Sequence, residues 1–81
     1  MMHDDNLVRM ANQIGTFFAS MPDAHEARDG IATHIKKFWD PRMRKAFLAT
    51  VDAGAPDSGI HDIVLAAVRE HRARLEAGIP A

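Results

Sequence analysis

Residues 34–45 read His34-Ile35-Lys36-Lys37-Phe38-Trp39-Asp40-Pro41-Arg42-Met43-Arg44-Lys45, and they contain the clearest helix boundary of the 81-residue chain. Asp40 is a residue type that caps helix N-termini, and Pro41 suits the first helical position, which needs no backbone N–H. A residue that precedes proline is pushed out of the helical region, so an earlier helix must stop near Trp39. The stretch therefore predicts two helices joined by a tight turn.

Apolar residues recur at helical spacing on both sides of this turn, and no segment alternates with the period of a strand. The pattern predicts helices over about residues 5–20, 23–39 and 40–54, and a fourth that starts near Asp57 or Ser58 and ends before Gly78. We expect an all-α protein: a small bundle of four short helices joined by tight turns. It forms a single domain over residues 1–81, ordered over about 5–77, with successive helices side by side and antiparallel.

Single residues mark where these helices start, end and cross. Asp23, followed three residues later by Glu26, resembles a capping box, and Gly54 suits a helix end. Gly15 stands inside the first helix, where glycine costs about 1 kcal/mol relative to alanine. A close crossing by another helix at Gly15 would offset that cost.

Composition excludes several classes of protein. The chain has no Cys, which excludes a disulfide scaffold, an iron–sulfur cluster, a thiolate zinc site and a cysteine nucleophile. Ten Lys and Arg against eleven Asp and Glu give a formal net charge of -1, so bulk attraction to nucleic acid or an anionic membrane is not expected. No apolar run approaches the roughly 20 residues of a membrane span, and the acidic start is unlike a signal peptide, which predicts a cytoplasmic protein.

The sequence contains no recognised catalytic or metal-binding motif. No pair of its five His residues has the i, i+4 spacing of a helical zinc site. Ser20 and Ser58 fall near expected helix ends, the acids gather near helix starts, and there is no glycine-rich phosphate loop. We therefore expect no enzymatic activity and no bound metal in this chain.

Half of the ten basic residues lie within residues 36–45, the basic turn: Lys36, Lys37, Arg42, Arg44 and Lys45. Lysines suit the C-terminal end of a helix, but three cations at the start of the next helix oppose its positive dipole end. Phe38 and Trp39 stand between them and point about 100° apart on a helix, so one of them packs in the turn or points outward. The basic turn predicts a site for an anion or for the acidic surface of a partner, the other interpretation being a solvated surface of long side chains.

Two blocks of the sequence carry a family resemblance. They read Leu7-Val8-Arg9-Met10-Ala11-Asn12-Gln13-Ile14-Gly15-x-Phe17-Phe18 and Gly30-Ile31-Ala32-x-His34-Ile35-x-x-Phe38-Trp39-Asp40-Pro41-Arg42-Met43-Arg44. In this order, and in a chain of this length, they are similar to the delta subunit of cytoplasmic NAD-dependent formate dehydrogenase. The resemblance covers roughly residues 7–70.

The resemblance implies a small accessory subunit of a multi-subunit molybdenum or tungsten enzyme. In such a complex the large catalytic subunit carries the pterin guanine dinucleotide cofactor that oxidises formate, and further subunits carry iron–sulfur clusters and flavin and reduce NAD. The delta subunit is expected to hold no redox centre, in agreement with the absence of Cys. Its implied role is assembly or stabilisation of the complex. The alternative is a chaperone-like protein that binds a phosphate-bearing ligand, a guanine nucleotide or the molybdenum pterin dinucleotide, during cofactor insertion.

The expected partner is the large catalytic subunit, and neither nucleic acid nor a membrane is expected. The residues predicted to contact a partner or an anion are Lys36, Lys37, Phe38, Trp39, Arg42, Arg44 and Lys45, with Asp40 and Pro41 defining the turn. Arg9, Asn12 and Gln13 are candidates for a second contact or for hydrogen bonds across the bundle. Because so small a core gains stability from a partner, self-association of the isolated chain also stays open.

Overall fold

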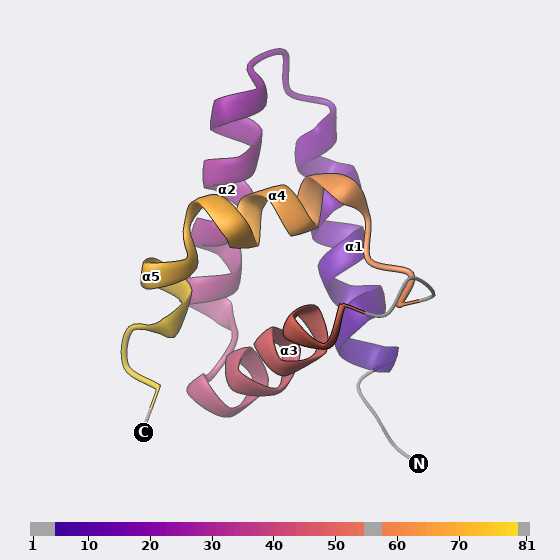
Figure 1. The fold of residues 1–81 in the computed structure, drawn as a ribbon. Helices are drawn as coiled ribbons and strands as arrows, with labels where there is room; N and C mark the ends of the chain where they lie inside the picture. Colours follow the sequence, from indigo (N-terminus) through magenta and orange to yellow (C-terminus); the bar gives the residue numbers. More distant parts are fainter. Residues whose placement is uncertain (1–4, 55–57, 80–81) are drawn as a thin grey trace.

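A computed structural model describes residues 5–54 and 58–79 of the chain. Within them the backbone forms helices and no strand, which confirms the all-α prediction: α1 (Asp5–Ala19), α2 (Ala24–Phe38), α3 (Pro41–Ala53), α4 (Asp62–Glu70) and α5 (Arg72–Glu76). α1 and α2 form an antiparallel hairpin, α4 crosses over both of them, and α3 lies across the end where α1 begins and α2 ends (Figure 1). None of these helices is long and apolar enough to span a membrane.

The last predicted helix starts later in the structure than expected, and it is divided into two helices. Residues 58–61 precede α4, which begins at Asp62, while position 57 lies outside the described residues. His71 has φ -117° and ψ 30°, and it separates α4 from α5. This bend turns α5 towards α2 and α3, where Leu75 becomes buried.

The helices are also less regularly stacked than the sequence predicts. Only α1 and α2 show the expected antiparallel pairing of neighbours, whereas α3 packs against α5 and α1 rather than along α2 (Figure 1). The turn between α2 and α3 is the cause, because the extended conformation of Trp39 and Asp40 directs α3 away from the axis of α2.

The predicted helix ends are confirmed where a specific side chain or glycine makes them. Asp23 Oδ1 accepts hydrogen bonds from the backbone N–H groups of His25, at 2.8 Å, and Glu26, at 3.1 Å. Gly54 ends α3 in the left-handed region, at φ 65°, which glycine adopts without a steric penalty. These caps satisfy backbone groups that a helix end would otherwise leave without a partner.

Gly15 allows the crossing of α4 over α1. A Cβ atom at Gly15 would lie 2.7 Å from Cγ2 of Val64 and 3.3 Å from Cγ2 of Ile63, closer than carbon atoms pack. The expected close crossing is therefore present, and it explains a glycine in the middle of a helix.

The buried apolar side chains form one contiguous core beneath α4. Val64, Ala67 and Val68 of α4 are almost inaccessible to solvent, and side chains from every other helix meet them. The remaining members of this core are Ala11, Ile31, Ala32, Ile35, Trp39, Phe47, Leu48, Ile60 and Leu75.

Candidate functional site

The turn between α2 and α3 has the local structure that its sequence predicts. Asp40 is the N-cap of α3, and its Oδ1 atom accepts a hydrogen bond of 2.9 Å from the backbone N–H of Met43. Pro41 occupies the first position of α3. Trp39 ends α2 and donates its backbone N–H to the carbonyl of Ile35 at 2.9 Å. Asp40 and Pro41 thus define the turn and set the direction of α3.

Two residues predicted to contact a partner or an anion lie inside the protein instead. Trp39 is 4% exposed, and its ring packs edge-on against Phe47 with 5.5 Å between the ring centroids. Arg44 is also 4% exposed. The interpretation of Trp39 and Arg44 as surface contact residues is therefore wrong for this fold, because both side chains point from the turn into the core.

Arg44 holds the ends of two helices together. Its guanidinium donates hydrogen bonds to Trp39 O at 2.8 Å and, more weakly, to Lys36 O at 3.4 Å, both at the C-terminal end of α2. It also donates to Leu75 O at 3.0 Å and Ala77 O at 2.9 Å, at the end of α5. Carbonyls at helix C-termini lack intrahelical partners and carry partial negative charge, so a buried cation satisfies them.

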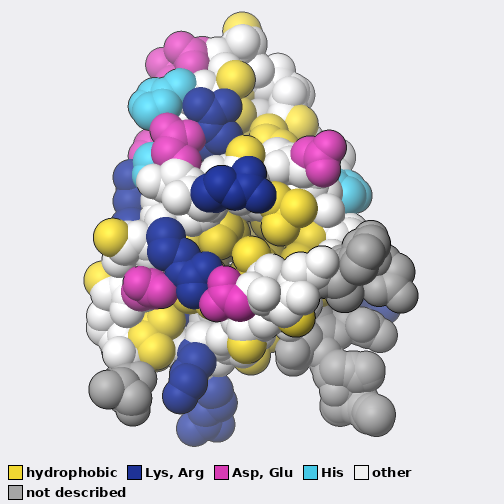
Figure 2. Space-filling model, in the orientation of Figure 1, with side chains coloured by type: hydrophobic (Ala, Val, Ile, Leu, Met, Phe, Trp, Pro, Cys, Tyr) yellow, Lys and Arg dark blue, Asp and Glu magenta, His cyan; other side chains and the backbone are white. Residues whose placement is uncertain are grey.

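The other predicted residues of the basic turn remain accessible. Lys37, Phe38, Arg42 and Lys45 are exposed, and Lys36 is half-buried. Asp40, Pro41, Arg42 and Lys45 line a shallow hollow at the start of α3. In Figure 2, Lys and Arg side chains project below α3, whereas basic and acidic side chains lie next to one another over α4 and α5.

A row of rings runs over α1 and α2, and we call it the aromatic surface: Phe17, Phe18, His34 and Phe38. Neighbouring ring centroids are 5.0 Å apart for Phe17 and Phe18, 6.4 Å for Phe18 and His34, and 4.6 Å for His34 and Phe38. Phe17 is 72% exposed and Phe38 is 64% exposed. Gln13, Ile14, Phe17, Phe18 and His34 line an apolar hollow beside them.

The exposure of Phe17 could not be predicted from the sequence, because Phe17 matches the apolar stripe of α1. Successive residues turn by about 100°, so Phe17 lies about 200° around the helix from Gly15, on which α4 packs. The stripe is wider than the face that α4 and α2 cover, and Phe17 is left outside. Only the direction from which α4 crosses could have indicated this.

Gly30 brings the aromatic surface close to the backbone of α2. A Cβ atom there would lie 2.5 Å from Cε1 and 2.6 Å from Cδ1 of Phe18. The absent side chain of Gly30 therefore provides the space in which the ring of Phe18 lies. Phe18 in turn supports the exposed ring of Phe17.

The predicted second contact divides into one structural residue and two exposed ones. The amide of Asn12 donates to Gly59 O at 2.8 Å and accepts from the backbone N–H of His61 at 2.9 Å. It thereby holds the extended residues before α4 against α1, which corresponds to the hydrogen bonds across the bundle that the sequence left open. Arg9 and Gln13 are exposed, and Gln13 borders the aromatic surface.

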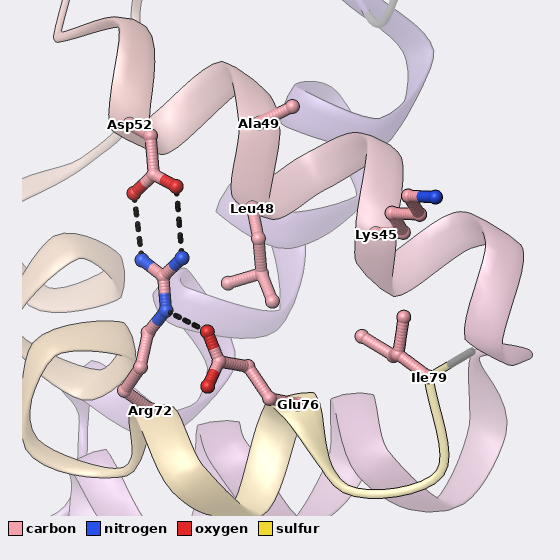
Figure 3. Close-up of a pocket in the computed structure, with 7 residues that line it drawn as sticks. All are labelled: Lys45, Leu48, Ala49, Asp52, Arg72, Glu76 and Ile79. Atoms are coloured by element: carbon pink, nitrogen blue, oxygen red, sulfur yellow. Dashed lines mark hydrogen bonds and ion pairs between the residues drawn. The ribbon is translucent and has the colours of Figure 1, made fainter. Parts of the chain in front are cut away.

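An ion-pair network closes a pocket between α3 and α5. Arg72 makes a bidentate pair with Asp52, at 2.7 and 2.8 Å, and a third bond of 2.8 Å with Glu76 (Figure 3). Lys45, Leu48, Ala49 and Ile79 complete the lining of the pocket. The three paired groups of this pocket, Asp52, Arg72 and Glu76, join α5 to α3.

A second group of ion pairs joins α2 to the bend at His71. Arg28 binds Glu70, and His25 Nδ1 lies 3.0 Å from the same carboxylate. Arg74 binds Asp29 at 2.8 Å and donates to the hydroxyl of Thr33 at 2.8 Å. The first group of ion pairs therefore holds α5 on α3, and the second holds residues 70–74 on α2. Within the described residues no three potential metal ligands gather.

These ion pairs predict that acid weakens the fold. Hydrogen bonds from Arg74, Arg72 and Arg28 hold the pKa values of the carboxyls of Asp29, Asp52 and Glu70, respectively, below their ordinary 3.8, 3.8 and 4.5. A carboxyl whose pKa is lowered in the folded state stabilises it above the unfolded pKa, and that contribution is lost as the pH falls through the folded pKa. We therefore expect the melting temperature to fall progressively below about pH 5.

The variant Asp52→Asn tests this pH dependence. It removes the pairing of Arg72 with a charged partner, so it should melt below the wild type at neutral pH and lose less stability on acidification. Thermal melting followed by circular dichroism between pH 7 and pH 3 measures both effects. Parallel curves for the two proteins would contradict a role of this ion pair in acid sensitivity.

The fold and its surface define a class of protein: a small all-α protein with an exposed aromatic surface beside a basic turn. The chain belongs to the NADH-dependent formate dehydrogenase delta subunit family, FdsD, whose family model matches residues 6–68. This match includes both blocks that carry the resemblance and confirms it. No curated protein and no solved structure matches the chain.

Proposed function

We propose that this chain is a non-catalytic accessory subunit that assembles or stabilises an NADH-dependent formate dehydrogenase by binding its large catalytic subunit. Membership of the delta subunit family supports a place in that complex. The observation that carries the accessory role is the exposure of Phe17 and Phe38, since large apolar side chains on a small protein are typical of a protein-binding surface.

The structural details also favour binding over chemistry. The exposed aromatic side chains offer contact area, and the charged groups that come close together join the helices of the fold. The pairs of Arg72 with Asp52 and of Arg74 with Asp29 connect α5 to α3 and α2. These groups hold the chain's own helices together, which leaves the aromatic surface and the basic turn as the parts free to meet a partner.

Co-expression of the complex with and without this chain tests the proposal. With the chain present, we expect it to elute from a sizing column together with the catalytic subunit. Without it, we expect less assembled complex and faster loss of formate-dependent NAD reduction on warming. Elution of the chain alone, together with a complex of unchanged yield and heat resistance, would contradict the proposal.

Chaperone-like binding of a phosphate-bearing ligand remains the second candidate, and the hollow at the start of α3 is its structural basis. Arg42 and Lys45 line that hollow. However, Arg44 and Trp39, which this role also required, are buried, and the carboxylate of Asp40 already accepts the backbone N–H of Met43. Calorimetric titration of the isolated chain with GDP and GTP tests the candidate. No heat at millimolar nucleotide would exclude it.

A further inference from the structure

The aromatic surface is already arranged as a binding site in the isolated chain. The two most exposed rings, Phe17 on α1 and Phe38 on α2, are connected through Phe18 and His34 by the ring contacts given above. Phe18 is held against the backbone of α2 at Gly30, so the row is supported from below. A preorganised surface loses little conformational freedom on binding, which favours affinity.

The charges beside this surface indicate what kind of partner it binds. The ammonium of Lys37 lies 5.7 Å from the centroid of the Phe38 ring. Within the described residues, 5–54 and 58–79, neither Lys37 nor Arg42 pairs with a carboxylate. Arg28, Arg72 and Arg74 all do. The nearest acid along the chain, Asp40, is used as the N-cap of α3. Lys37 at the edge of the aromatic surface, and Arg42 at the start of α3, therefore carry positive charge without a direct ion-pair partner among these residues.

A second copy of the chain is a poor occupant of this surface. A two-fold contact places the same patch on both sides, so each copy would bring the cations Lys37 and Arg42 to the interface. Like charges across an interface oppose association, whereas carboxylates around an apolar side chain would complement both the rings and the cations.

We propose that the aromatic surface binds an acidic segment of the catalytic subunit, with one or more apolar side chains of that segment packed on Phe17 and Phe38 and with its carboxylates facing Lys37 and Arg42. This inference rests on the proposed function for the identity of the partner. It adds the surface that this chain uses and the chemistry of the segment that it meets.

Binding of purified variants to the catalytic subunit tests the proposal. The double variant Phe17→Ser, Phe38→Ser should bind more than about 100-fold more weakly, because exposed aromatic anchors commonly dominate an interface. The double variant Lys37→Glu, Arg42→Glu should bind more weakly at low salt, and the difference from the wild type should shrink as salt is added. Arg69→Glu, an exposed charge reversal on α4, is the matched control and should bind as the wild type does.

Thermal melting verifies that each variant is folded, and Phe17→Tyr, which retains the ring, should bind nearly as the wild type does. If the wild type binds and the serine variant binds equally well, the surface is wrong while the proposed function stands. If the wild type itself does not bind, the proposed function fails. If the isolated wild type is a dimer and the double serine variant is a monomer, a second copy occupies the surface and the inference is overturned.

Discussion

Replacing Arg44 with Met is expected to lower the free energy of unfolding by about 3–5 kcal/mol, because several buried carbonyls lose their partner at about 1–3 kcal/mol each. The substitution keeps an unbranched apolar stem but removes every hydrogen bond that the guanidinium donates. Carbonyls at the ends of α2 and α5 would then be buried without a partner. Small domains are stable by only about 5–15 kcal/mol, so this loss is a large share of the total stability.

Arg42→Met is the matched control for this prediction, because Arg42 lies two residues earlier on α3 and is exposed. It should change stability by less than about 0.5 kcal/mol. Arg44→Lys should lie between them, since an ammonium keeps the charge but cannot reach carbonyls of both helices at once. Urea unfolding of the three variants measures the differences. Equal midpoints for Arg44→Met and Arg42→Met would mean that Arg44 does not hold the two helix ends together.

Replacing Trp39 with Ala is expected to cost about 3–5 kcal/mol of stability, as for other large aromatic side chains in a core. The indole is 4% exposed and contacts Phe47, so its removal leaves a cavity under the turn. Trp39 is the single tryptophan of the chain, so its fluorescence reports directly on this site. In the native wild type the emission should be that of a shielded indole and should shift to longer wavelength on unfolding.

The neighbouring variant Phe38→Ala provides the contrast. Phe38 is 64% exposed, so its loss should hardly affect unfolding, yet it should weaken binding to the catalytic subunit. Trp39→Ala should instead lose binding only to the extent that it unfolds. The opposite pattern, with Trp39→Ala stable and Phe38→Ala unstable, would show that the roles of the two rings are exchanged.

The parts of the fold that depend on neighbouring residues could be predicted from the sequence. The caps at Asp23 and Asp40, the proline at the start of α3 and the left-handed Gly54 each act within one helical turn. The close crossing at Gly15 could also be anticipated, because a glycine inside a helix is costly unless something approaches it. Local chemistry is sufficient for all of these features.

The features that could not be predicted depend on contacts between distant parts of the chain. Arg44 conflicts with the dipole of its own helix, and the sequence offers no sign that carbonyls 31 and 33 residues later would receive it. The bend at His71 contains neither glycine nor proline, and it follows from the packing of Leu75 and the pairing of Arg74 with α2. The local conflict at Arg44 was a real signal, but its explanation lies inside the protein.

The observed candidate site differs from the predicted one for the same reason. A pattern of apolar residues shows which side chains can be buried, but it cannot show which of them another helix covers. Phe17 fits the stripe of α1 and is exposed, whereas Trp39 lies within the basic turn and is buried. The basic turn keeps Lys37, Phe38 and Arg42 at the surface, and the fold adds the rings of α1 to them.

Photo-crosslinking from the assembled formate dehydrogenase complex tests most directly whether the aromatic surface is the docking face. A photoreactive phenylalanine analogue placed at position 17 or 38 keeps a ring where the chain has one, and the same analogue at position 69 on α4 serves as the control. We expect crosslinks to the catalytic subunit from positions 17 and 38 and none from position 69. Crosslinks from position 69 with none from 17 or 38 would contradict it.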